Sequence, residues 1–308
     1  MTDLAVAHHE LRPLMFSIAY RMLGSVAEAE DIVQEAFLRI HKAVDAGEVL
    51  EVPEAYATTV TTRLAIDTLR SARIKRETYP GSWLPEPILD DDTDPAHRLE
   101  LDDTVSTAFL VVLERLSPVE RAVFLLREVF GYGYDEIAEV VQKSEANCRQ
   151  LFARAKSHLD DERPRFDPSP EHRAELAARF FAALHDGDVK GLERLLADDV
   201  MFYADGGGKV PAIAKPLRGV LRVGRFLLGL MRIRARATGR LIPVEANGHP
   251  AARLELATGE LVGVMMLDIA DGRIQAIRNQ LNPDKLHHLG QGGDIRALAS
   301  TTDTPPPD

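Results

Sequence analysis

An acidic segment between residues 86 and 103 constrains the fold of this chain more than any other feature. It holds eight acids and one base, Arg98, and prolines stand at positions 85, 87 and 95. Because like charges repel one another and proline cannot continue a helix, the segment predicts an extended linker. Three prolines between residues 164 and 170 mark a second break. We therefore expect folded pieces at about 1–80, 104–163 and 170–288, joined first by an acidic linker at 81–103.

Composition narrows the class of protein. Apolar residues make up 45% of the chain and charged residues 28%, as in soluble globular proteins. No apolar run reaches the roughly 18 residues of a membrane span, and the N-terminal residues lack the pattern of a secretory signal. The single cysteine, Cys148, excludes a disulfide framework and a multi-cysteine metal site. We expect a cytoplasmic protein without a membrane partner, and a disordered tail at 289–308 with little to bury.

The first piece is predicted to be helical throughout. Within residues 27–42, apolar side chains recur with the spacing of a helix that buries one face. Glu28, Asp31 and Glu35 then share an arc of about 60° on the opposite side. This acidic stripe is either an ordinary solvated face or a docking surface.

A long helix is expected from about Glu54 to Arg76. Residues 63–76 carry five bases and one acid, Asp67, in a chain whose net charge is −11. Local cations of this kind are what contact with nucleic-acid phosphate requires. A charged helix end with no partner is the alternative.

The second piece has the pattern of a helix-turn-helix. Ser117 and Pro118 are typical of a helix start, residues 134–141 form a short amphipathic helix, and Ser144 caps the next helix, which runs to about Leu159. Cys148, Leu151, Phe152, Ala155 and Leu159 are expected to face inward. Polar side chains of the kinds that contact base edges and phosphates remain outside: Arg149, Gln150, Arg154 and Lys156. Plain helical packing would explain the same pattern.

The third piece has a different pattern. Helices are expected at 171–184, 189–196 and 219–234, and strands at 200–204, 251–257, 261–269 and 273–281, which together form an α+β piece. On the helix at 219–234, an arginine face of Arg218, Arg222, Arg225 and Arg232 spans about 80°. We considered the acidic linker, or one of the first two pieces, as the partner of this face.

Catalytic and cofactor motifs are not found. The sequence has no phosphate-binding loop ending in Gly-Lys-Ser/Thr, no Gly-x-Ser-x-Gly elbow and no His-Glu-x-x-His. The glycine cluster at 205–209 could hold an anion, but a flexible loop is the simpler explanation. We therefore predict no catalytic residues, no metal and no cofactor.

Four segments in this order resemble the bacterial sigma factors of the extracytoplasmic-function class. They are residues 29–39 (AEDIVQEAFLR), 63–70 (RLAIDTLR), 116–124 (LSPVERAVF) and 134–138 (YDEIA). The likeness implies a helical region 2 at 1–80 and a helix-turn-helix region 4 at 104–163. It also implies a protein that recruits core RNA polymerase to promoter DNA, and not an enzyme.

The resemblance assigns roles to individual residues. Glu28, Asp31, Gln34 and Glu35 correspond to the surface that docks on the β′ clamp helices, and the β subunit is a further expected partner. Residues 45–53 correspond to a loop that captures an unstacked base of the −10 element. Contacts to the −10 element fall on Arg63, Asp67, Arg70 and Arg73. Contacts to the −35 element fall on Arg149, Gln150, Arg154 and Lys156.

The third piece, 170–288, resembles a SnoaL-like domain of the NTF2-like cone fold. Residues 83–87 (WLPEP), 205–209 (DGGGK) and 282–285 (NPDK) are similar to signatures of the sigma subgroup that carries this extension. The resemblance implies regulation in cis. The regulatory residues are then Asp205, Gly206, Gly207, Gly208, Lys209, Asn282, Pro283, Asp284 and Lys285.

Two other classes of function remain open at this point. A helix-turn-helix activator would bind DNA without replacing sigma, but it needs neither the 31–39 motif nor the basic 63–76 helix. Alternatively, the third piece is an enzyme or binds a small-molecule ligand, since cone folds offer an apolar cavity.

Overall fold

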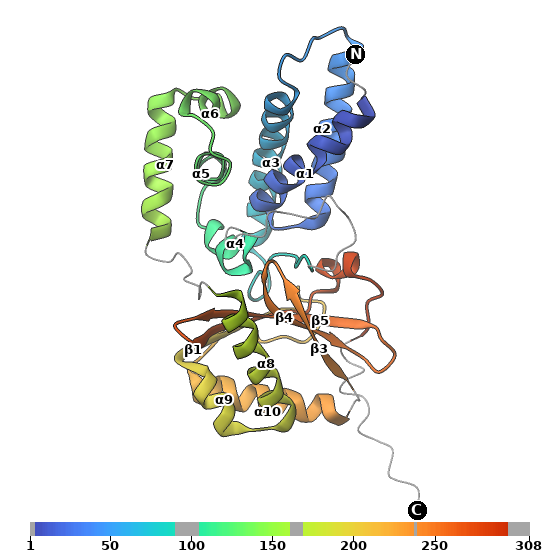
Figure 1. The fold of residues 1–308 in the computed structure, drawn as a ribbon, viewed down its shortest axis with the longest axis vertical. Coiled ribbons are helices and arrows are strands. Elements are labelled where there is room, and N and C mark those ends of the chain that lie inside the picture. The colour runs from blue at the N-terminus through green and yellow to red at the C-terminus, as the bar shows by residue number, and fades with distance from the viewer. Residues whose placement is uncertain (1–3, 90–104, 161–168, 237–238, 295–308) are drawn as a thin grey trace, which may run out of the picture. The chain divides into compact units, whose positions relative to one another are not determined.

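The computed structural model describes residues 4–89, 105–160, 169–236 and 239–294. Side chains within helices at residues 4–8, 73–75, 77, 160 and 232–236 also lie outside the description. The chain divides into two compact units. The first contains residues 1–78 and 92–164, and the second contains residues 79–91 and 165–308. Figure 1 shows the elements of each.

Three long helices form the N-terminal part of the first unit: α1 (Leu4–Leu23), α2 (Val26–Asp45) and α3 (Pro53–Glu77). Ser25 caps α2 by accepting a hydrogen bond from the Glu28 amide. The buried face of α2 includes Ile32, Val33 and Phe37, as the spacing predicts. The prediction of a helical first piece is confirmed.

Four shorter helices complete this unit: α4 (Thr107–Leu113), α5 (Pro118–Glu128), α6 (Tyr134–Val141) and α7 (Glu145–Asp160). Ser117 and Glu120 form a capping box at the start of α5. Gln142 ends α6 in the left-handed conformation, and Ser144 accepts from the Asn147 amide at the start of α7. The helix-turn-helix is present as predicted. The expected inner residues of α7 are buried except Phe152, which is half-buried and stacks on Phe124.

The second unit pairs three helices with one sheet. The helices are α8 (Pro170–Asp186), α9 (Val189–Leu195) and α10 (Val220–Arg236). The strands are β1 (Leu196–Asp205), β2 (Leu217–Arg218), β3 (Arg240–Ala246), β4 (His249–Glu255), β5 (Leu261–Ala270) and β6 (Arg273–Gln280). Their order is β2-β1-β6-β5-β4-β3, with β1 parallel to β6 and the other pairs antiparallel. The α+β fold is confirmed, but β2 and β3 were not predicted.

The sheet has an apolar core on each face. The helices cover one face, where Phe180, Phe202, Leu227 and Leu267 pack together. Met266, the neighbour of Leu267 on β5, points to the opposite face and packs with Leu89 and Leu286. Leu89 lies in the sequence that was expected to be a solvated linker.

The start of the linker therefore departs from the prediction. Leu84, Glu86, Ile88 and Leu89 are all buried in the second unit. Burial of apolar side chains favours this packing, and Glu86 is the one acid of the segment among the described residues. The remaining linker residues, 90–104, lie outside the described residues.

The first residues of the predicted disordered tail are ordered. Residues 291–293 pair with the start of β5, where the Leu261 amide donates to the Gln291 carbonyl (3.0 Å) and the Gly293 amide to the Leu261 carbonyl (2.8 Å). Residues 295–308 lie outside the description. Among the described residues, no helix is long and apolar enough to cross a membrane.

Candidate functional site

The acidic stripe lies on the solvent side of α2. Asp31 and Gln34 are exposed, and Glu28 and Glu35 are half-buried. Glu35 also forms an ion pair with Arg39 one turn later, at 2.8 Å. An exposed pair of this kind contributes little to stability.

The basic helix α3 brings Arg63 against the helix-turn-helix. The Arg63 guanidinium donates to the Glu139 carbonyl (2.8 Å) and to the Val140 carbonyl (2.9 Å), at the C-terminal end of α6. A helix C-terminus carries partial negative charge, which makes it a suitable partner for a cation. The Nε and Nη2 atoms of Arg63 donate in these two hydrogen bonds, so moving the whole guanidinium to another partner would break both.

The other −10 candidates on α3 are less engaged. Asp67 and Arg70 form an exposed ion pair of 2.8 Å. They line a hollow of about 230 Å³ together with Arg63 and Lys143. Arg73 belongs to α3, but its side chain lies outside the described residues.

The −35 candidates all face solvent. Arg149, Gln150, Arg154 and Lys156 are exposed along α7. Arg149 pairs with Glu145 (2.7 Å) and lies over the Tyr134 ring (5.0 Å), which restricts its position. Arg154 lies 3.6 Å from Glu120. The helix therefore presents one polar, mostly cationic surface.

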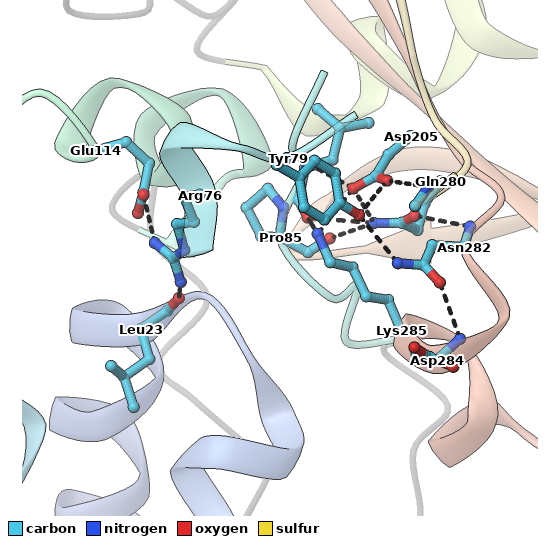
Figure 2. Close-up of polar contacts among 12 residues, drawn as sticks. Leu23, Arg76, Tyr79, Pro85, Glu114, Asp205, Gln280, Asn282, Asp284 and Lys285 are labelled. Carbon is cyan, nitrogen blue, oxygen red and sulfur yellow. Dashed lines mark hydrogen bonds and ion pairs between the residues drawn. The ribbon is translucent and has the colours of Figure 1, made fainter. Parts of the chain in front are cut away.

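A buried charge cluster that the sequence did not indicate joins four helices of the first unit. Glu114, at the end of α4, accepts hydrogen bonds from Arg76 of α3 and from Arg121 of α5 (Figure 2 shows Arg76 and Glu114). Arg76 also donates to the Leu23 carbonyl (2.6 Å), and Arg121 donates to the Arg21 carbonyl (3.2 Å), both on α1. Arg121 has no exposed surface.

In the second unit, Asp205 is the centre of a second buried polar cluster, which we call the linker anchor (Figure 2). Asp205 has no exposed surface. Its carboxylate accepts from the Tyr79 hydroxyl (2.6 Å), the Leu84 amide (2.8 Å) and the Gly207 amide (3.0 Å). Burial and the Asp205 carboxylate raise the pKa of Tyr79 well above its usual value, so the phenol stays protonated and donates.

Lys285 supplies the positive charge of the linker anchor. Its ammonium group donates to Asp205 (2.7 Å) and to the Leu84 carbonyl (2.6 Å). It also lies over the rings of Tyr79 (4.8 Å) and Trp83 (4.4 Å), in cation–π geometry. Trp83 belongs to the linker, and Tyr79 lies just before it.

Side-chain amides complete the hold on the linker. Gln280 donates to the carbonyls of Leu84 (3.2 Å) and Pro85 (3.1 Å), and Asn282 donates to the Tyr79 hydroxyl (2.9 Å). Farther along, the side-chain oxygen of Asn247 accepts from the Ile88 backbone amide (3.1 Å). The backbone amide of Asn247 donates to the Ile88 carbonyl (2.8 Å). These contacts satisfy linker backbone groups that burial would otherwise leave without partners.

The predicted regulatory residues divide between the anchor and its rim. Asp205, Gly207, Asn282 and Lys285 take part, and a Cβ at Gly207 would lie 2.3 Å from the Asn282 side chain. Gly206 and Gly208 allow the tight loop beside them. Lys209 and Asp284 form an exposed ion pair (2.6 Å), and Pro283 begins the 3-10 turn Pro283–Lys285. Tyr79, Gln280 and Asn247 were missed, because nothing local in the sequence marks them as partners.

A hollow of about 390 Å³ adjoins the linker anchor. Leu281, Pro283 and Leu286 line it, while Gln280, Asn282 and Lys285 of the same segment hold the linker. The described part of the chain contains no group of three or more His, Cys, Asp or Glu side chains that could hold a metal ion.

Comparison with known proteins identifies the family of the chain. The family model for sigma-70 region 2 matches residues 8–74, and that for sigma-70 region 4 matches residues 106–159. The chain is 38% identical to the ECF RNA polymerase sigma factor SigJ of Mycobacterium tuberculosis over 89% of its own length and 90% of that protein's. It is 32% identical to the probable ECF RNA polymerase sigma factor SigI of the same species, over 90% and 93%.

A solved structure has a similar fold. The crystal structure of Mycobacterium tuberculosis SigJ covers 91% of this chain and 96% of its own, with 35% sequence identity and a TM-score of 0.75. The likeness extends through the C-terminal α+β unit.

Proposed function

The chain belongs to the ECF RNA polymerase sigma factors, and from this premise we propose that its C-terminal unit controls transcription initiation in cis by holding the start of the interdomain linker. Proteins of this family bind core RNA polymerase and direct it to promoter DNA. The observation that carries the proposal is the burial of linker residues Leu84, Ile88 and Leu89 in the C-terminal unit.

Holding the start of the linker shortens the length of chain that is free between regions 2 and 4. From Thr78, where α3 has ended, to Val105, just before α4, a free linker could span about 90 Å at most. From Leu89 onward the free part could span only about 55 Å. Holding residues 79–89 therefore limits how far regions 2 and 4 can separate, which matters if binding of a promoter requires them apart.

We assign the surfaces of the first unit to the polymerase and the promoter. The acidic stripe of α2 is proposed to dock on the β′ clamp helices, because a negative face gives register on a positive one. The helix-turn-helix is proposed to contact duplex DNA of the −35 element through α7. Arg63 is proposed to contact DNA of the −10 element, either in place of the α6 carbonyls or through the N–H groups that do not bond to them. The assigned residues are Glu28, Asp31, Gln34 and Glu35 for polymerase, Arg63, Asp67, Arg70 and Arg73 for −10, and Arg149, Gln150, Arg154 and Lys156 for −35.

Run-off transcription tests these assignments together. With purified core polymerase and a pool of genomic promoters, the full chain should give specific transcripts, and removing residues 169–308 should change their yield. A rise would show that the C-terminal unit restrains initiation, and a fall that it promotes it. Equal yields would contradict control in cis, and no transcripts from either form would contradict the polymerase and promoter assignments. Alanine at an assigned residue should reduce the yield.

The hollow beside the linker anchor supports a second proposal, that the C-terminal unit binds a small apolar carboxylate. Six apolar side chains line the hollow, and its wall also carries Asp294 and Lys209. Lys209 pairs with Asp284 (2.6 Å), so a ligand carboxylate would take the place of Asp284 in that exposed pair. Decanoate titrated into the full chain should raise the unfolding temperature, since a ligand at a hundred times its Kd stabilises by about 2.7 kcal/mol. The rise should shrink in Lys209→Ala. An unchanged unfolding temperature at every concentration would count against this ligand class.

A further inference from the structure

One long stretch of the C-terminal unit has a charge opposite to that of the whole chain. Residues 206–244 contain nine bases and no acid, whereas the full chain has a net charge of −11. Seven of the nine bases are arginines. A solvated surface of an acidic protein would normally mix both signs, so this stretch calls for an anionic partner.

The structure places the described bases of this stretch at the surface. On α10, Val223, Leu227 and Met231 are buried against the sheet. Arg222 and Arg225 are exposed, as are Lys215 and Arg218 just before the helix. We call these four residues the basic face.

Acids near the basic face neutralise little of it. Arg218 lies 3.6 Å from Asp199, and both side chains are about 70% exposed (71% and 70%). At that distance and exposure, the pair contributes almost nothing and is readily exchanged for another anion.

The described part of the linker lies away from the basic face. Leu89 packs on the face of the sheet that carries Met266, whereas α10 packs on the face that carries Leu267. The docked part of the linker and α10 thus lie on opposite faces of one sheet (Figure 1). Glu86, the first acid of the linker, is buried on its own side of the sheet.

We propose that the basic face binds the phosphate backbone of promoter DNA upstream of the −35 element. Arginine suits this role because its planar guanidinium pairs with phosphate through two hydrogen bonds. Nine residues separate the end of α7 from the start of α8, so the C-terminal unit is tethered to the DNA-binding helix by at most about 35 Å of chain. Such a tether raises the effective concentration of DNA at the basic face.

The test measures how holoenzyme affinity for DNA depends on salt. Core polymerase carrying the full chain is titrated with two fragments of one promoter, one ending just upstream of the −35 element and one extended by about two helical turns. With the extended fragment, Arg222→Ala/Arg225→Ala should reduce the slope of log K against log salt by about two, since each lost phosphate contact removes about one. With the short fragment, the variant and the natural chain should agree.

Two control variants separate this contact from general charge effects. Arg179→Ala/Arg194→Ala removes the same charge from exposed positions on α8 and α9 and should leave the slope unchanged. Arg222→Lys/Arg225→Lys keeps both charges and should therefore keep most of the slope of the natural chain. The proposal is overturned if the alanine variant at Arg222 and Arg225 behaves like the Arg179/Arg194 control, or if it weakens only the binding of core polymerase. The proposal is also overturned if the alanine variant changes the slope equally with the short and the extended fragment.

Discussion

Lys285→Met should lower the free energy of unfolding of the C-terminal unit by about 3–5 kcal/mol, the usual cost of removing one partner of a buried ion pair. Lys285 is 8% exposed and Asp205 is fully buried, so the variant leaves a carboxylate inside the protein without its cation. The Leu84 carbonyl loses a donor at the same time. For a unit of this size, such a loss lowers the unfolding temperature by about 6–20 °C.

A second lysine of the same unit provides the control. Lys209→Met removes an ion pair with Asp284, but the two side chains are 53% and 61% exposed. Solvent screens such a pair, so the expected loss is at most about 1 kcal/mol. Thermal unfolding of both variants, followed by circular dichroism, makes the comparison. Similar losses in the two variants would show that the Asp205 pair is not an anchor.

The same variant connects stability with control of transcription. Because Lys285 contacts Leu84, Tyr79 and Trp83, its loss should free the start of the linker, and proteolysis near residues 79–89 should become faster. The run-off yield of Lys285→Met should then move toward that of residues 1–168. A freed linker with an unchanged yield would show that holding the linker is structural and not regulatory.

The first unit was largely predictable because its signals are local. Ser117 and Glu120, three residues apart, form the capping box that starts α5. The apolar spacing of Ile32, Val33 and Phe37 is enough to define the buried face of α2. In such segments, neighbours in sequence decide the structure.

The linker anchor was only partly predictable, because its contacts are distant in sequence. The Leu84 amide meets a carboxylate 121 residues away, and nothing near Leu84 indicates it. The charge of the segment favoured a solvated linker, whereas its apolar residues at 84, 88 and 89 decided the outcome. Strand β3 was missed for a related reason: Pro243 lowers its strand propensity, and its place at the edge of the sheet makes the proline acceptable.

The Glu114 cluster gives the second large expected effect. Glu114→Gln should destabilise the first unit by about 3–5 kcal/mol, because Arg121 would keep its charge in a fully buried position without an anion. The Arg121 Nη2 atom has no hydrogen-bond partner among the described residues even in the natural chain. Glutamine keeps the size of the side chain, so the loss reports charge and not a cavity.

The same carboxylate should make the first unit sensitive to acid. Burial alone would raise the pKa of Glu114, but the guanidinium groups of Arg121 and Arg76 outweigh it and hold the pKa below its usual value. Since the folded-state pKa is lower than the unfolded one, of about 4.3, the stabilisation is complete above that pH. It is lost as the pH falls through the folded-state pKa.

Unfolding of the natural chain and of two variants separates this contribution from general charge effects. Between pH 7 and pH 3, the first unit of Glu114→Gln should lose less stability than that of the natural chain, because the variant has no carboxylate to protonate. Glu145→Gln removes an exposed pair with Arg149, at 48% and 56% exposure, and should change stability by only a few tenths of a kcal/mol.

Glu114 joins α4 and α5 to α1 and α3, so its loss should also loosen the contact that keeps Arg63 on α6. Natural-like stability of Glu114→Gln at pH 7 would mean that Arg121 finds another way to satisfy its charge, and that this cluster does not hold the two DNA-binding regions together.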